Sequence, residues 1–407
     1  MSDKQQGRRS EKAGVLNFTK EMVSALVMAF IAIVYVIQAF RIPTGSMENS
    51  LLVGDFLLGL KFIYGAPVLP FTYAKFPGLT DPKPGDIIIF KYPGTDRKDY
   101  IKRCVAGPGQ TVQIAEKILI VDNDTIPLPP RGQHTDNGLL PCHLGRTAQV
   151  TTRAVIADGD TVVRSAVPAE RFDSLAAAHP SDTLTLHRAV AIRHGDTVEI
   201  PSDPRARIDG RRVISEKGII DDRVTYFRPL RVPAAGDTMY PEQFDIREFL
   251  FAKHLIRQEH PRADVTTKFR MFVDGVYANN AELSTPFGGS FTVESHLEAL
   301  DKVDSWTLLD DQLAMLAAAF PGQAVTFEKL ILLDGREVSK YVVKKDNYFM
   351  MGDNRDNSMD SRFWGYLNDN FVKAKAFILY FSLDKETPLW LLPAKIRWNR
   401  IGKLIRS

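Results

Sequence analysis

Three polar segments stand in otherwise apolar sequence and carry residue types that can do nucleophilic chemistry. Ser46 follows a glycine turn, Lys102 lies in a run with strand-like alternation, and a dense polar loop spans 351–365. A serine hydroxyl is a weak nucleophile until a base removes its proton, so Ser46 needs a base within reach. None of the eight histidines lies in these segments, which leaves a Ser-His-Asp triad without an obvious base.

A lysine serves as a base at neutral pH only in an unusual environment. Its ordinary pKa is about 10.4, so burial must disfavour the ammonium before a neutral form accumulates. Period-two alternation puts Tyr100, Lys102 and Cys104 on one face of a predicted strand. We therefore predict that Lys102 points into the core of the sheet. Each feature alone has a plainer interpretation: a turn serine, a lysine whose head group reaches solvent, and a solvated loop.

The elements that would position these residues are predominantly β. Runs rich in β-formers and separated by Gly, Pro or Asp-Asn turns occur at 86–91, 100–105, 111–114, 340–351 and 374–381. Between them lies a looser region, about 115–327, with strand-like pieces at 161–163 and 189–200 and helical pieces at 169–178 and 310–320. We predict a mainly β chain in which antiparallel sheet flanks an inserted β-rich or mixed region.

Composition narrows the class of protein without giving a function. The 407 residues are 44% hydrophobic and 25% charged, which excludes collagen-like, disordered and multi-span membrane classes. A net charge of +3 is too small to indicate a nucleic-acid partner. The two cysteines match no zinc spacing, and we expect no metal and no cofactor. We expect a buried free thiol at Cys104, with a disulfide to Cys142 as the alternative.

One stretch is long and apolar enough to span a membrane. Residues 22–40 carry no charge and, as a helix, reach roughly 28 Å, close to a bilayer's hydrocarbon thickness. Positive charge concentrates before the stretch, so the N-terminus is expected in the cytoplasm. A cleaved secretory signal is the alternative, although its apolar core is usually about 7–15 residues long. The basic, tryptophan-containing segment 386–407 either lies in the headgroup layer or packs on its own domain.

Together, the three polar segments match one family in order and in residue type. The chain resembles bacterial signal peptidase I, the membrane-anchored Ser-Lys protease that removes signal peptides from exported proteins. The resemblance covers about 41–114 and 334–383, and it implies a catalytic domain of two antiparallel sheets. Gln110 stands where the family commonly has Asp, and the middle region looks like an enlarged version of the family's variable second domain.

The resemblance also implies roles for individual residues. Ser46 matches the nucleophile, Lys102 the general base and Ser358 the hydroxyl that orients the lysine. Thr44 falls where a hydroxyl, with the Ser46 backbone N–H, resembles the oxyanion hole. The matches to structural support residues are Arg103, Asp353, Asp360 and Arg362. The matches to the substrate pockets are Ile42, Pro43, Met47, Leu51, Tyr100 and Ile101.

The expected organisation runs from a cytoplasmic tail through an anchor into a split catalytic core. Its parts are the tail at 1–21, a transmembrane helix at 22–40, core at 41–114, an inserted second domain at 115–330, core again at 331–385 and a basic amphipathic segment at 386–407.

The expected function is cleavage of N-terminal signal peptides after small-x-small sites, at the outer face of a bacterial cytoplasmic membrane. The expected partners are preproteins and the lipid bilayer, and the chain is expected to be a monomer. Two alternatives stay open. One is a regulatory Ser-Lys membrane protease with few substrates, and the other is a catalytically silent, membrane-tethered scaffold that binds a partner through its middle region.

Overall fold

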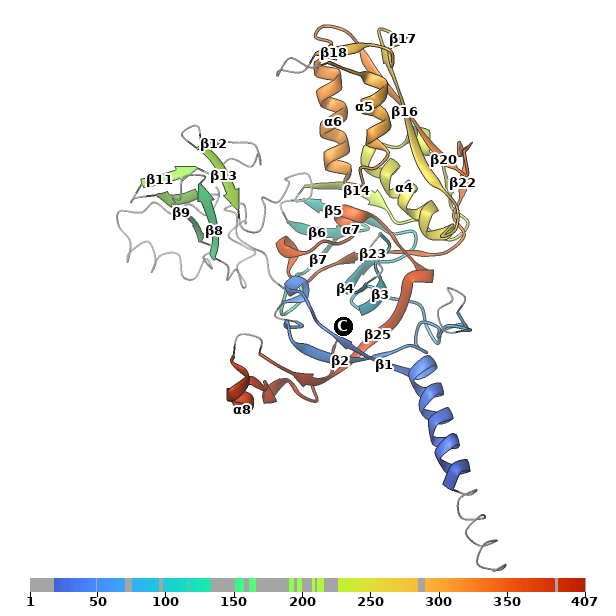
Figure 1. Ribbon diagram of the computed structural model, residues 1–407, viewed down its shortest axis with the longest axis vertical. Helices are drawn as coiled ribbons and strands as arrows, with labels where there is room; N and C mark the ends of the chain where they lie inside the picture. The colour runs from blue at the N-terminus through green and yellow to red at the C-terminus, as the bar shows by residue number, and fades with distance from the viewer. Residues whose placement is uncertain are drawn as a thin grey trace, which may run out of the picture. The chain divides into compact units, whose positions relative to one another are not determined.

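The fold is known from a computed structural model of the chain (Figure 1). The structure describes residues 18–48, 50–69, 75–94, 98–115, 117–132, 226–284, 290–384 and 387–406, and, between 151 and 215, the backbone of six strands. The strand pairs whose register is described are antiparallel, so the expected mainly β, antiparallel fold class is confirmed. The chain divides into two compact units. Unit 1 comprises Met1–Arg41, Gly54–Asp81 and Lys373–Arg406, and unit 2 comprises Ile42–Val53 and Pro82–Val372.

An apolar helix leads into the sheet of unit 1. The helix, Phe18–Val36, has a mean hydropathy of 1.7 and no buried share, and its length and composition suffice to cross a membrane. Strand β1 (Ile37–Arg41) follows it directly and pairs with β2 (Asp55–Leu60), which pairs with β25 (Val372–Ser382). The helix therefore begins and ends earlier than the expected 22–40, because the backbone from residue 37 onward pairs with β2.

The C-terminal segment packs along the edge of β25. Its short helical turns are η7 (Leu389–Leu391), α8 (Leu392–Lys395) and η8 (Trp398–Arg400). Leu379 N–H donates to the Lys403 carbonyl at 2.9 Å, and Arg400 forms a buried two-point ion pair with Asp55 at 3.0 and 2.6 Å. Packing on its own unit, one of the two expected alternatives, is therefore observed. Trp390 and Trp398 stay 84% and 65% exposed, and lipid contact remains a prediction.

Unit 2 is built from several small antiparallel sheets. One group of strands has the order β3 (Ile87–Lys91), β4 (Asp99–Ala106), β23 (Asn347–Met351) and β24 (Leu367–Asn368), which are four neighbouring strands of a seven-stranded sheet. The others are β14 (Phe227–Arg231), β5 (Thr111–Ala115), β6 (Ile118–Val121) and β7 (Asp124–Ile126); β15 (Thr238–Met239) with β22 (Tyr341–Val342); β17 (Val276–Tyr277), β16 (Val265–Val273), β20 (Val325–Leu333) and β21 (Arg336–Glu337); and β18 (Glu282–Ser284) with β19 (Ser290–Thr292). The backbone-only sheet has the order β11 (Asp196–Glu199), β10 (Val190–Arg193), β9 (Thr161–Ser165), β8 (Thr151–Ile156), β13 (Arg211–Ser215) and β12 (Arg207–Ile208).

Two hairpins of the β16 sheet turn on the same dipeptide. Asp274-Gly275 joins β16 to β17, and Asp334-Gly335 joins β20 to β21. The φ angles are 50° and 77° in the first turn and 50° and 76° in the second. Two consecutive positive φ angles match the twist of a two-residue hairpin, and Asp-Gly tolerates them at low cost. These turns fix the register of the β16–β17 and β20–β21 hairpins.

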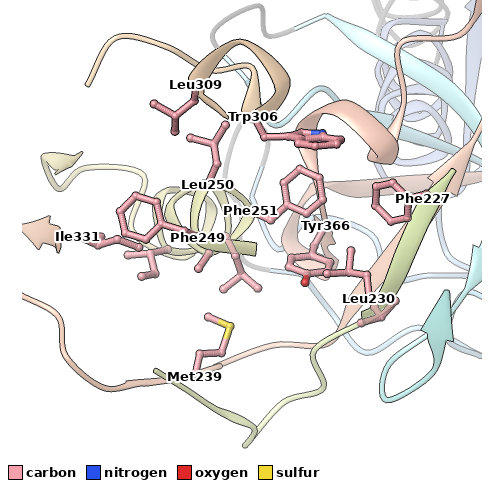
Figure 2. Close-up of a cluster of buried hydrophobic side chains, with 14 of the residues drawn as sticks. Phe227, Leu230, Met239, Phe249, Leu250, Phe251, Trp306, Leu309, Ile331 and Tyr366 are labelled. Atoms are coloured by element: carbon pink, nitrogen blue, oxygen red, sulfur yellow. The ribbon is translucent and has the colours of Figure 1, made fainter. Parts of the chain in front are cut away.

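Three helices lie beside the β16–β20 ladder (Figure 1): α4 (Ile246–Glu259), α5 (Val293–Leu300) and α6 (Trp306–Ala318). Asp245 starts α4 with a capping box, since its carboxylate accepts the Glu248 N–H at 2.8 Å and Glu248 accepts the Asp245 N–H at 3.2 Å. Apolar side chains of α4 and α6 then pack with those of β14 and β20 in one core (Figure 2). This core includes Phe227, Phe249, Leu250, Phe251, Trp306, Leu309, Ile331 and Tyr366.

Most expected elements have counterparts. The strand runs correspond to β3, β4, β5, β22 with β23, and β25, while the pieces at 161–163 and 189–200 correspond to β9, β10 and β11. The piece at 310–320 falls in α6, and the piece at 169–178 lies outside the described residues. Cys104 has a free, buried thiol, as expected; Cys142 lies outside the described residues. Gln110 closes its turn by accepting the Gly107 N–H at 2.9 Å.

Candidate active site

Ser46 lies in a short helical turn, η2 (Gly45–Met47), and the polar loop after β23 holds the backbone of that turn. Asn354 N–H donates to the Ser46 carbonyl at 3.1 Å, and the Asn354 side-chain amide donates to the Gly45 carbonyl at 3.0 Å. Met47 is buried. The turn is therefore fixed from two sides, with the Ser46 hydroxyl at its partly exposed surface.

Lys102 reaches Ser46 from strand β4. Its Nζ lies 2.5 Å from Ser46 Oγ, within hydrogen-bond distance. Strand β4 has β3 on one side and β23 on the other, and Lys102 is only 3% exposed. The expected burial of Lys102 is thus observed. Burial lowers the pKa of Lys102 from 10.5 to about 8, because removing the ammonium from water disfavours the charged form.

The charged groups around Lys102 largely oppose one another. Asp360 and Asp353 act to raise the pKa of Lys102, whereas Arg362 acts to lower it, and burial exceeds each of them. The two carboxylates are themselves paired with arginines, which limits the attraction that they exert on the ammonium. The cluster therefore supplies polar support around the lysine while leaving its pKa low.

The first ion pair joins β4 to the polar loop. Arg103 Nε and Nη2 each donate to one oxygen of Asp353 at 2.8 Å, and both groups are buried. Arg103 Nη1 donates to the Gly85 carbonyl at 2.6 Å, and Ser50 Oγ donates to Asp353 at 2.5 Å. A planar guanidinium that hydrogen-bonds to both oxygens of a carboxylate fixes the orientation of both side chains. This pair therefore ties Lys102's strand to the loop that also holds Ser46.

The second ion pair forms at the start of α7 (Ser361–Trp364). Asp360 caps this helix and accepts from Arg362 Nε at 2.8 Å and Nη2 at 2.9 Å. Asp360 also accepts the Gly352 N–H at 3.1 Å. Burial acts to raise the pKa of Asp360, but the charge and hydrogen bonds of Arg362 outweigh it and the pKa is lowered. Asp360 is thus held as a carboxylate beside Lys102.

Ser358 lies in the same loop, but it makes no hydrogen bond to Lys102 here. Its buried Oγ has no partner with hydrogen-bond geometry among the described residues, although the hydroxyl adds slightly to the lowered pKa of Asp360. Gly352 allows this close packing. A Cβ added at Gly352 would lie 2.2 Å from Ser358 Oγ and 2.5 Å from the Ser46 carbonyl oxygen. Only a glycine fits between the serine turn and the loop.

The remaining expected site residues lie on the turn η2, on the chain that flanks it at 42–51, or on β4. Thr44 is exposed, and its Oγ1 lies 3.5 Å from Ser46 Oγ. Of the expected pocket residues, four are buried, namely Ile42, Met47, Leu51 and Ile101, whereas Pro43 is exposed and Tyr100 is half-buried. The Tyr100 ring centroid lies 5.6 Å from Lys102 Nζ. The structure therefore brings the expected residues into one neighbourhood within unit 2.

Sequence reasoning missed three residues that hold this site. Asn354 and Gly352 belong to the polar loop, so the density of polar residues and the local glycine were available signals. Ser50 contacts Asp353 across a sequence separation of 303 residues, and no local pattern indicates that contact. Within the described part of the chain, no group of His, Cys, Asp and Glu side chains is placed to hold a metal ion.

Chemically, the arrangement joins a hydroxyl to an amine that is partly neutral near pH 8. Such a pair can transfer the hydroxyl proton to the amine and expose an oxygen nucleophile. The Thr44 hydroxyl lies 3.5 Å from the Ser46 hydroxyl, where a donor could face a developing oxyanion.

Comparison with known proteins assigns the family. The family model described as signal peptidase, peptidase S26, matches residues 15–162 and 270–381, more than half of the chain. The chain belongs to this family. Its apolar N-terminal helix, together with that membership, indicates membrane anchoring.

Three relatives, each named signal peptidase I, illustrate the similarity. The Pseudomonas aeruginosa protein is 36% identical over 113 residues, covering 28% of this chain and 39% of the relative. The Aquifex aeolicus protein is 43% identical over 79 residues, covering 19% and 26%. The Buchnera aphidicola (subsp. Baizongia pistaciae) protein is 21% identical over 383 residues, covering 93% and 80%. The stronger matches thus span well under half of the relatives' length, while the nearly full-length match is more distant.

Proposed function

We propose that this chain is a signal peptidase of type I, a serine endopeptidase in which Ser46 is the nucleophile and Lys102 the general base. The observation that carries the proposal is the 2.5 Å approach of Lys102 Nζ to Ser46 Oγ, made by a lysine that is 3% exposed. Membership of the S26 peptidase family supports the same reaction class.

In the first step, Lys102 Nζ takes the proton of Ser46 Oγ as that oxygen attacks the carbonyl carbon of the scissile bond. At pH 7 a lysine with a pKa of about 8 is neutral in about one tenth of the molecules, roughly 300-fold more than an ordinary lysine. Burial thus raises the fraction of Lys102 that is neutral and able to act as a base. The buried Ser358 hydroxyl, which has no hydrogen-bond partner among the described residues, would orient the amine by hydrogen-bonding to it during the reaction.

The tetrahedral intermediate places a negative charge on the former carbonyl oxygen. The Thr44 hydroxyl and the Ser46 backbone N–H are the proposed donors to that oxyanion. The intermediate collapses as the C–N bond breaks, and the Lys102 ammonium returns its proton to the leaving amine. Lys102 then takes a proton from the water molecule that attacks the Ser46 ester, and returns it to Ser46 Oγ as the bond between the acyl carbon and Oγ breaks, which restores the free enzyme.

The substrate would be an extended segment of a preprotein with small side chains at alternate positions. Such a segment could add as a strand beside Ile42-Pro43 and the Tyr100-Ile101 part of β4, since β-augmentation offers pockets to every second side chain. The buried Ile42, Met47, Leu51 and Ile101 support shallow pockets that favour alanine-sized groups. In the sequence, Ser46 follows the apolar helix by only a few residues, which supports a substrate whose cleavage point emerges from the bilayer.

The finer organisation is part of the same proposal. The residues at 41–114 and 331–385 would form a two-sheet catalytic domain, interrupted by an inserted domain at 115–330. The N-terminal tail would be cytoplasmic and the catalytic domain would face outward from a bacterial cytoplasmic membrane, acting as a monomer with preproteins and lipid as its partners. The charge asymmetry around the apolar helix supports this orientation.

The test is cleavage of a preprotein with an Ala-x-Ala site by the purified full chain in detergent. Wild type is compared with Ser46→Ala and Lys102→Met, and with Ser339→Ala and Lys340→Met, which change exposed residues of the same types. We expect cleavage after the Ala-x-Ala site by wild type and both exposed-site controls, and loss of cleavage in folded Ser46→Ala and Lys102→Met.

The outcomes separate the alternatives. Equal inertness of all five proteins towards several preproteins would favour the silent scaffold. Cleavage of only one or two among many preproteins, still abolished by Ser46→Ala, would favour a regulatory protease with few substrates.

A further inference from the structure

The chain that follows the second ion pair lies against helices that the proposed reaction does not use. We call residues 362–368 the docked segment. Trp306, the first residue of α6, donates its indole N–H to the Arg362 carbonyl at 2.9 Å, and both side chains are buried. Helix α6 is thus hydrogen-bonded to a residue that supports the candidate active site.

Helix α4 continues the same contact along the docked segment. His254 Nδ1 lies 3.1 Å from the Trp364 carbonyl oxygen, and Gln258 Nε2 donates to the Tyr366 carbonyl at 2.7 Å. Gln258 Oε1 accepts the N–H of residue 368 at 2.9 Å. His254 and Gln258 are four residues apart on α4, so they share one helix face.

The carbonyl groups of three alternate residues of the docked segment, 362, 364 and 366, each lie within hydrogen-bond distance of a helix side chain. Residues 367 and 368 pair with β23 on one side. On the other side, helix side chains rather than a strand take the polar backbone groups. Because a buried carbonyl without a partner costs free energy, these contacts specify where the segment lies.

Packing reinforces the hydrogen bonds. Gly365 has a φ of 86°, and a Cβ there would lie 2.7 Å from Phe251 Cγ. Phe251, Tyr366 and Trp306 lie near one another in the core (Figure 2). The Phe251 and Tyr366 rings meet edge to face, with centroids 5.8 Å apart. Helix α4 therefore packs directly against the backbone of the docked segment.

A short series of contacts connects the docked segment with Ser46 and Lys102. Arg362 forms an ion pair with Asp360, and Asp360 accepts the Gly352 N–H at 3.1 Å. Gly352 in turn has no room for a Cβ against Ser358 Oγ and the Ser46 carbonyl oxygen. A shift of the Arg362 backbone would therefore be passed to the loop around Ser46 and Lys102.

We propose that Trp306 is a positioning residue for the Ser46–Lys102 reaction, and that helices α4 and α6 hold the active loop through the docked segment. This inference rests on the proposed function. It assigns the helical part of the middle region a share in the geometry of the reaction.

The test compares Trp306→Phe with Leu309→Ala in the full-length chain. Phe keeps an apolar ring but leaves the Arg362 carbonyl without the indole donor. Leu309 is buried one turn further along α6, so Leu309→Ala weakens the same helix without removing a bond to the loop. We expect Trp306→Phe to lower kcat by roughly five- to tenfold with KM nearly unchanged. Leu309→Ala should lower the Tm and keep the wild-type kcat.

Hydrogen exchange gives a second readout that needs no activity. Peptides covering 350–364 should exchange faster in Trp306→Phe than in wild type and Leu309→Ala. Wild-type kcat or unchanged exchange in Trp306→Phe would overturn the inference, as would a loss of kcat in both variants in proportion to their loss of Tm. A wild-type chain that cleaves no preprotein would instead overturn the proposed function, and exchange alone would then decide whether Trp306 holds the loop.

Discussion

At the scale of single residues, Lys102 meets two opposed demands. Its amine must be neutral to accept a proton, yet a neutral lysine at ordinary pH exists only where the folded chain keeps the ammonium from water. Two neighbouring ion pairs, Arg103–Asp353 and Asp360–Arg362, surround it without leaving an isolated carboxylate that would restore the charge. The burial of Lys102 in the folded chain therefore lowers its pKa, and this allows it to be a candidate base.

The first prediction concerns the pH dependence of cleavage. Because the proposed base is neutral Lys102, whose pKa is lowered to about 8, kcat/KM should rise about tenfold per pH unit well below pH 8 and level off above it. The measurement is kcat/KM from pH 6 to 9.5 at constant ionic strength. A flat profile across this range would exclude Lys102 as the base that limits the rate.

The second prediction concerns the stability cost of that base. The pKa of Lys102 is 10.5 in an ordinary setting and about 8 in the fold, so the folded state binds fewer protons between these values. Below pH 8 the full penalty applies, and it disappears as pH rises towards 10.5. Lys102→Met should therefore be more stable than wild type by up to about 3 kcal/mol at pH 7, and this advantage should shrink between pH 8 and 10.5.

The measurement is the free energy of unfolding by denaturant in detergent, across that pH range. Lys340→Met serves as the control, because it replaces an exposed lysine and removes no buried charge. A constant difference between Lys102→Met and wild type would show that the burial of charge is not the cause.

At the scale of elements, the strands and α4 differ in how visible they are in sequence. Runs such as the one in β3 are short, rich in β-branched residues and bounded by turns, and they were predicted. Helix α4 was not predicted, although Asp245 and Glu248 form a capping-box pattern before an apolar run. Its buried face includes Lys253, His254 and Gln258, whose polar partners come from distant segments, so the amphipathic pattern is blurred.

The third prediction concerns the start of α4. Asp245→Ala removes the carboxylate that accepts the Glu248 N–H, and should lower the free energy of unfolding by about 1 kcal/mol. Glu248→Gln keeps an acceptor for the Asp245 N–H and should cost less. Urea denaturation of both variants checks this. Equal losses would mean that the charge of Glu248, rather than the capping geometry, stabilises the helix.

At the scale of the whole molecule, this chain of the S26 peptidase family carries an apolar helix near its N-terminus. The helix is fully unburied in the described structure, and the residues after it enter a sheet directly. The fourth prediction is the orientation of the anchor. In intact spheroplasts, external trypsin should digest the region after the helix, whereas a tag at the N-terminus should stay protected until the membrane is permeabilised. Protection of the C-terminal region instead would reverse the proposed topology.

The sequence by itself determined the features that depend on neighbours along the chain. Alternation predicted the β4 strand and the burial of Lys102, uncharged length predicted the apolar helix, and turn residues separated the strands. The order of the three polar segments also indicated the S26 family. These properties are local or additive, so a linear pattern carries them.

Only the tertiary structure decided how distant groups meet. The contact of Ser50 with Asp353, the fit of Gly352 against the Ser46 carbonyl, and the hydrogen bond from Trp306 to Arg362 all join segments far apart in sequence. Even the end of the apolar helix was set by pairing of β1 with β2 rather than by hydropathy. Such contacts depend on the complementary shape and polarity of surfaces that exist only once the chain has folded.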